Sequence, residues 1–172
     1  MAYTKRWVKI DSLNGKRKVS VKRLEISPIL RYSFERDKST GYLRLNYSAK
    51  NSRLIIKGGR YIQQYNWEDP IHPFVNTFTT LLLGNNLMKI YERDFVDLSY
   101  RQRFNDKYTF IGNVNWAKRY ELFNHSNYTV FNSNKGEYTP NAPINVELPS
   151  TTFQPNTALV STIGFTAQPW IK

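Results

Sequence analysis

Apolar and polar residues alternate along most of the chain, which is the pattern of β-strands with two unlike faces. Between residues 29 and 36, for example, Leu30 and Tyr32 alternate with Arg31 and Ser33. Turn residues such as Asn14-Gly15 separate the alternating runs and favour hairpins. The pattern predicts strands at about residues 3–11, 18–36, 41–49, 52–62, 88–104, 107–117 and 158–168.

One stretch breaks this alternation and predicts a short helix at residues 73–83. Its apolar residues recur at helical spacing, Pro73 stands at the opening position, and Gly84-Asn85-Asn86 provides a stop. The apolar stripe of this helix consists of Phe74, Phe78 and Leu82. In the predicted strand at residues 52–62, Gly58-Gly59 indicates either a β-bulge or a close approach of two backbones.

The predicted fold is therefore all-β: an antiparallel up-and-down meander in a single domain spanning residues 1–172. A long loop rich in Asn, Ser and Pro is expected at 118–157. The apolar face has two interpretations: the core of a soluble sandwich, or the lipid-facing side of a transmembrane β-barrel with a polar lumen. Long loops are common on the outer side of such barrels, which favours the second. Seven strands are fewer than a bacterial barrel needs, so a partial barrel or segment is expected.

Composition and charge narrow the classes of binding partner that the chain could have. Twenty-five Lys and Arg against 13 Asp and Glu give a formal charge of +12, so an anionic partner or a basic soluble surface is expected. No run approaches the roughly 20 apolar residues of a spanning helix, whereas barrel strands need only about 9–11 alternating residues. Aromatic residues make up 15% of the chain, and Tyr and Trp suit a boundary between an apolar phase and water.

The sequence offers little that could carry catalysis, so we expect no enzyme, no metal and no cofactor. Without cysteines there is no disulfide scaffold, Cys-ligated zinc site or thiol nucleophile. His72 and His125 are far apart, and neither has a second ligand at metal-binding spacing. Glu92 and Asp94 could form an acid–base pair, but charges paired with neighbouring arginines are the more ordinary interpretation.

The strings GGRYIQQYN, VNTF and LLLGNNLMKIYERDF lie between Gly58 and Phe95, and WAKRYELFNHSNYTVF and YTPNAP follow later. With these strings the sequence resembles a family of Bacteroidota outer-membrane proteins of unassigned function, and the likeness runs from about Arg23 to Gln168. Members often carry an N-terminal domain similar to the carboxypeptidase regulatory domain, which is immunoglobulin-like and implies no peptidase activity. The resemblance implies a segment of a large barrel in the bacterial outer membrane. Its implied partners are outer-membrane lipid or lipopolysaccharide, and further barrel strands or another subunit.

On this interpretation the chain is non-enzymatic and serves transport, assembly or surface scaffolding. The residues expected on the polar, lumen-facing side are Arg31, Arg44, Arg60, Arg93 and Arg101. The aromatic residues expected at the boundary between the apolar phase and water are Tyr32, Tyr47, Tyr100 and Trp116. The alternative is a soluble, periplasmic or cytoplasmic, basic β-sheet module that binds an anionic ligand. Nucleic acid is disfavoured as that ligand because the chain carries no RNA-binding or zinc-finger signature.

Overall fold

A computed structural model describes residues 2–13, 16–34, 36–66, 68, 70–104, 107–124, 129–131, 138–143 and 153–168. The predicted turn residues Asn14 and Gly15, and His125, lie outside these ranges. The elements follow the order β1 (Tyr3–Leu13), β2 (Lys16–Ser33), β3 (Lys38–Ser48), β4 (Ser52–Gln64), α1 (Pro73–Leu83), β5 (Ile90–Phe104), β6 (Tyr108–Tyr120) and β7 (Asn156–Ala167).

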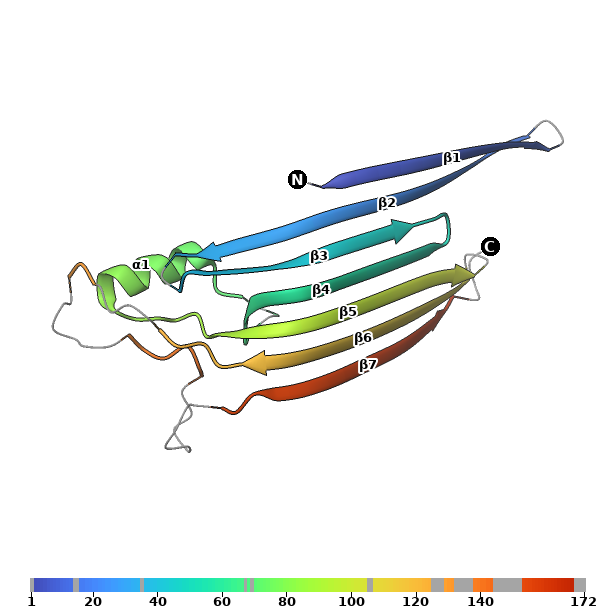
Figure 1. Ribbon diagram of the computed structural model, residues 1–172. Helices are drawn as coiled ribbons and strands as arrows, with labels where there is room; N and C mark the ends of the chain where they lie inside the picture. Colours follow the sequence, from blue (N-terminus) through green and yellow to red (C-terminus); the bar gives the residue numbers. More distant parts are fainter. Residues whose placement is uncertain are drawn as a thin grey trace.

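The seven strands form one antiparallel sheet in which every strand pairs with its neighbours in sequence (Figure 1). The predicted meander with one inserted helix is therefore confirmed. The sheet does not close into a barrel: β1 and β7 are its edges, and within the described residues they do not pair with each other. Register is continuous along each pair, as between Ser52–Gln64 of β4 and Ile90–Gln102 of β5.

Continuous register gives the sheet two different faces, because directly opposite residues point to the same side. We call the side that carries Arg93, Asp97 and Arg101 of β5 the polar face. The other side carries Val96, Leu98 and Tyr100 of the same strand, and we call it the apolar face. The sheet is thus a single layer, and neither face is covered by a second sheet within the described residues.

Few residues are buried for a chain of this length. The buried hydrophobic residues that the structure describes are Ile62, Tyr91, Phe95, Ala117, Leu122 and Ala142. They gather where the strands meet the segments that carry α1 and the connection after β6. Most of the apolar face has no such cover, and this is the main feature that a function must explain.

Gly59 marks a close approach of strands, and neither Gly58 nor Gly59 forms a bulge, because pairing continues through both residues without an extra one. Gly59 has a φ of +150°, and a Cβ there would lie 2.7 Å from the Cα of Tyr42. The absent side chain leaves room on the polar face. There the rings of Tyr42 and Phe95, from the strands on either side, meet edge-on with centroids 5.5 Å apart.

Helix α1 has the bounds that the sequence predicted, and its caps explain them. His72 precedes it, and its Nδ1 accepts a hydrogen bond from the backbone N–H of Phe74 at 3.2 Å. Pro73 opens the helix, and Gly84 closes it in the left-handed conformation with φ of 69°. The helix lies at one end of the strands (Figure 1).

A buried amide network ties the segment after α1 to the connection after β6. Asn86 donates through Nδ2 to Oδ1 of Asn141 at 2.7 Å, and Asn141 in turn donates to the carbonyl of Leu122. The Thr139 hydroxyl accepts from the backbone N–H of Asn86 and donates to its carbonyl, both at 2.9 Å. Both asparagines are buried, so these bonds replace lost water contacts and fix the two segments together.

We predict that Gly59→Ala lowers the free energy of unfolding by about 1–3 kcal/mol, because the new Cβ meets Tyr42 and the backbone must leave its φ of +150°. Thermal unfolding followed by circular dichroism measures this loss. Gly58→Ala is the matched control, since a Cβ there meets the Phe95 carbonyl oxygen at an ordinary 3.4 Å. Equal effects at the two positions would contradict the role given to Gly59.

Candidate functional site

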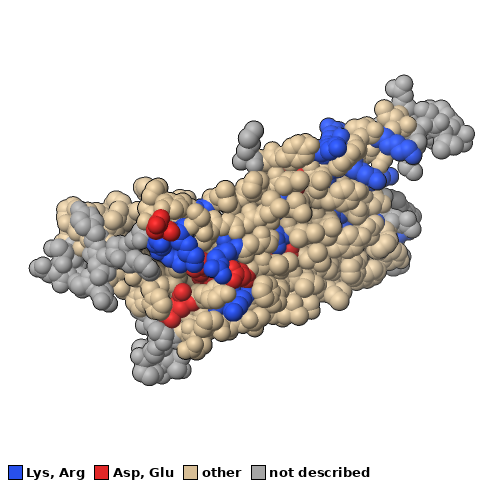
Figure 2. Space-filling model, viewed as in Figure 1, with Lys and Arg blue, Asp and Glu red and all other residues tan. Residues whose placement is uncertain are grey.

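The apolar face presents a band of large side chains that is largely exposed. Leu159 is 69% exposed, Ile163 78% and Phe165 65% on β7, and neighbouring strands continue the band. Its further exposed members are Leu30, Leu43, Val96, Leu98, Tyr100, Phe104, Tyr108, Val114 and Trp116. Figure 2 shows one face of the molecule on which Lys, Arg, Asp and Glu gather near α1 and near β1 and β2, with other residues between. Contiguous exposure on this scale is rare on soluble monomers.

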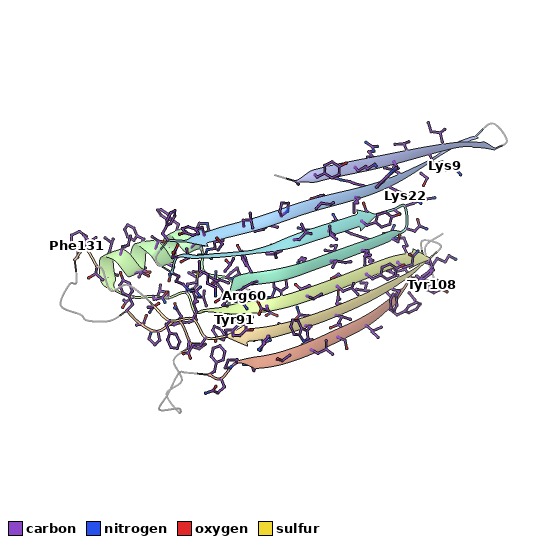
Figure 3. All side chains as sticks on the ribbon, viewed as in Figure 1. Lys9, Lys22, Arg60, Tyr91, Tyr108 and Phe131 are labelled. Carbon is purple, nitrogen blue, oxygen red and sulfur yellow. The ribbon has the colours of Figure 1, made fainter. Side chains whose placement is uncertain are left out.

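Aromatic residues border this band at both ends. At the end far from α1, Tyr108 stacks on Phe165 with centroids 5.8 Å apart, and Tyr100 lies 6.4 Å from Phe110 (Figure 3). At the end near α1, Trp116 and Tyr32 lie on the same face. Trp116 and Tyr108 are eight residues apart on β6, so the band is about 27 Å long at roughly 3.4 Å per residue.

Beyond the band, next to α1, the apolar face ends in a cluster of paired charges. Arg60 donates to both carboxylate oxygens of Asp94, at 2.5 and 2.6 Å, and the Tyr120 hydroxyl donates to Asp94 at 2.9 Å. Two residues before Asp94 on β5, Glu92 pairs with Arg36 at 2.8 Å and with Lys38 at 2.9 Å. The side chain of Glu92 is only 6% exposed, so this pair is nearly buried.

The ion pairs control the protonation of both carboxylates. Burial disfavours the charged form of Glu92, but the hydrogen bonds from Arg36 and Lys38 outweigh it and hold its pKa below the usual value. The bidentate bond from Arg60 likewise lowers the pKa of Asp94, against a smaller effect of burial. Both groups are therefore ionised at neutral pH and act as fixed charges.

The polar face contains a cavity of about 560 Å³ between the strands and the segment around α1. Arg31, Lys57 and Arg93 supply its positive charge, and Asp97 is its carboxylate. Asp97 pairs with Arg93 at 3.6 Å and accepts a hydrogen bond from Asn115. The guanidinium of Arg93 also lies over the ring of Phe95, 4.1 Å from its centroid. The remaining lining residues are Tyr42, Tyr61, Ile62, Gln63, Gln64, Pro70, Pro73, Met88, Ile90 and Phe95.

Of the arginines that the sequence assigned to the polar side, Arg31, Arg44, Arg93 and Arg101 lie on the polar face. Arg60 lies on the opposite face, because it stands directly across from Asp94. The alternation of side chains along β4 could have predicted this position. Arg60 is three residues from Lys57, and strand residues an odd number apart point to opposite faces. Of these five arginines, only Arg31 and Arg93 line the cavity of the polar face.

Tyr32, Tyr47, Tyr100 and Trp116, which the sequence predicted at a boundary between an apolar phase and water, all lie on the apolar face. Sequence reasoning missed Phe104, Tyr108 and Phe165, which also border the band. The signal available for them was their position at strand ends beside predicted turns.

Helix α1 has its apolar stripe on the outside. Phe74 is 72% and Phe78 58% exposed, and Leu82 is half-buried. The side that contacts the rest of the chain is polar: Asn76 donates to the side chain of Asn86 at 3.1 Å and accepts from the backbone N–H of Met88 at 2.7 Å. The helix is thus held by amide bonds and offers its phenylalanines outward.

Within the described ranges, no three His, Asp or Glu side chains come close enough together to hold a metal ion. His72 has a structural role, because its side chain caps the N-terminus of α1. The helix that the described residues form is too short and too weakly apolar to cross a membrane.

The comparison with protein families gives one match. A model described as family of unknown function (DUF5686), C-terminal domain, covers residues 6–172. No curated protein and no solved structure matches the chain.

We predict that Glu92→Gln destabilises the protein by about 3 kcal/mol near pH 7, because Arg36 then lies nearly buried without its carboxylate. The depressed pKa means that Glu92 stabilises the fold above its ordinary pKa of about 4.5 and loses this effect as pH falls through the folded value. Thermal unfolding from pH 7 to 3 should therefore show the two proteins converging at low pH.

The control for this experiment is Glu25→Gln, which removes the same charge from the more exposed pair with Arg23. We expect it to cost at most about 1 kcal/mol. A gap between Glu92→Gln and the unmodified protein that stays constant down to pH 3 would contradict the ion-pair explanation.

Proposed function

The chain belongs to the DUF5686 C-terminal domain family, and from its two-faced sheet we propose that it forms part of the wall of an outer-membrane β-barrel. The proposed role is non-enzymatic: transport, assembly or surface scaffolding. In this proposal the apolar face contacts lipid or lipopolysaccharide and the polar face lines the lumen.

The exposed apolar band carries the proposal. A single sheet with so small a buried core leaves Leu159, Ile163 and Phe165 without cover, and in water this exposure is unfavourable by roughly 25 cal/mol per Å². Lipid would cover the band at no such cost. The outward phenylalanines of α1 point to the same apolar surroundings.

The dimensions of the band support a lipid environment over a protein cover. Strands of outer-membrane barrels tilt by about 35–45°, so a band of about 27 Å along β6 would span roughly 20 Å of the membrane, within the roughly 25 Å of the apolar belt on such barrels. Aromatic side chains at both ends correspond to the aromatic girdles of such barrels. The Arg60–Asp94 and Glu92 pairs stand beyond the band, where charges can reach water.

Closure of the barrel requires more strands than the seven described here. The outer edges of β1 and β7 leave backbone groups available for pairing, and an open edge does not persist in the hydrocarbon phase. Further strands of a longer protein, or another subunit, would complete the sheet.

The direct experiment is to express the chain and test whether it enters detergent extracts of membranes and migrates differently on a gel before and after heating. A protein that stays monomeric and soluble in plain buffer would overturn the proposal. It would favour the alternative, a soluble basic sheet that binds an anionic ligand.

We predict that Leu98→Arg, in the middle of the band, lowers the free energy of unfolding from lipid vesicles by about 2–4 kcal/mol. Ser99→Arg is the matched control, because the adjacent residue of β5 lies on the polar face and should tolerate the charge. Urea titration followed by tryptophan fluorescence measures both. If the apolar face were in water, Leu98→Arg would cost no more than Ser99→Arg.

A further inference from the structure

The polar face places positive charges directly opposite one another on neighbouring strands. Four such pairs occur among the described strand residues, and all four lie on this face: Arg6 with Arg23, Arg44 with Lys57, Arg53 with Arg101, and Arg93 with Arg119. Side chains in directly opposite positions have Cβ atoms only about 4.5–5.5 Å apart, and like charges there destabilise a sheet.

Among the described strand residues, no two cations stand directly opposite each other on the apolar face. There Asp94 stands opposite Arg60 on one side and opposite Lys118 on the other, so unlike charges meet. One unlike pair also occurs on the polar face, where Lys57 stands opposite Asp97. The repeated cation pairs are therefore a property of one face and not of basic strands in general.

Few carboxylates balance the polar face. Among the side chains that the structure describes there, only Glu25 and Asp97 are acidic, and they pair with Arg23 and Arg93. Apart from Lys38, whose ammonium turns to Glu92, the cations of this face are Arg6, Arg23, Arg31, Arg44, Arg53, Lys57, Arg93, Arg101, Arg103 and Arg119. Cations thus outnumber carboxylates on the part of this face that the structure describes, which favours binding of an anion.

We propose that the polar face is a binding track for an extended, carboxylate-rich polypeptide segment. Nine of its ten cations are arginines, whose planar guanidinium group suits bidentate bonds to carboxylates. Three of the pairs recur at the levels of Arg93, Asp97 and Arg101 on β5, four residues apart each time. That is a spacing of about 13 Å, which an extended acidic chain reproduces every fourth residue.

The cavity forms one end of this track. Arg31, Lys57 and Arg93 line it, while Arg53 and Arg101 lie toward the opposite end of the strands. A segment entering the cavity would meet Lys57 and Arg93, one member of each of the first two cation pairs, and continue along β4 and β5 to the next pair.

Nucleic acid fits the same charges less well. Single strands gain affinity by stacking bases on aromatic rings. On this face Tyr42 packs edge-on against both Tyr61 and Phe95, and Phe95 is 4% exposed, so these rings are already engaged. The charges are therefore better matched by a chain of carboxylates.

This inference does not require the apolar face to lie in a membrane, and its test is separate. Binding of fluorescent poly-L-glutamate to the full chain, kept in solution with detergent, is measured by anisotropy at increasing NaCl. Affinity should fall as salt rises, since screening weakens the charge interactions. Arg53→Gln/Arg101→Gln should weaken binding by at least about threefold, as two exposed ion pairs are lost.

The matched control is Lys9→Gln/Lys22→Gln, which removes the same two charges from the apolar face (Figure 3). We expect it to leave binding within about twofold of the unmodified chain. Equal losses in the two variants would show a general charge effect and overturn the proposal. Tighter binding of a single-stranded oligothymidylate of matched charge would also overturn it, in favour of nucleic acid.

A second readout separates binding from folding. Because Arg53 and Arg101 repel each other, Arg53→Gln/Arg101→Gln should raise the midpoint of thermal unfolding while it weakens binding. A variant that loses binding because it is poorly folded would show a lower midpoint. A midpoint that is unchanged or lower would contradict the repulsion between paired cations on which the proposal rests.

Discussion

The backbone hydrogen-bond ladder that joins the seven strands is the constraint on which the rest of this structure depends. Side chains alternate with a period of two, so the pairing register decides the face of every strand residue. Because register is continuous from β1 to β7, Val96, Leu98 and Tyr100 join one apolar surface, while Arg93, Asp97 and Arg101 join a polar one. A single slipped residue would mix the two surfaces across a whole strand.

A single layer with two such faces needs two different surroundings. The apolar face is not covered by another layer of the described chain, and it ends in the ion pairs of Glu92 and of Arg60 with Asp94. These charges limit the exposed apolar band at one end, and the aromatic residues around Tyr108 limit it at the other. The polar face instead gathers arginines that repel one another, which calls for anions. The proposed lipid contact and the proposed acidic ligand thus follow from the same register.

The segment around α1 shows how local and long-range contacts combine. His72 and Gly84 define the ends of the helix from its own sequence. The amide bonds of Asn76 and Asn86 decide which side faces the protein, and they turn Phe74 and Phe78 outward. The helix therefore extends the apolar character of the protein beyond the strand ends and does not fill the polar face.

The sequence by itself determined the strands, the helix at residues 73–83 and the two-sided alternation, because these depend on local periodicity and turn chemistry. It also pointed to Arg31, Arg44, Arg93 and Arg101 as members of one polar surface. Only the tertiary structure decided that Arg60 lies opposite Asp94, that Arg36 and Lys38 meet Glu92 from more than fifty positions away, and that cations stand opposite cations. Those facts depend on register and on contacts between distant segments, which no local pattern of residues specifies.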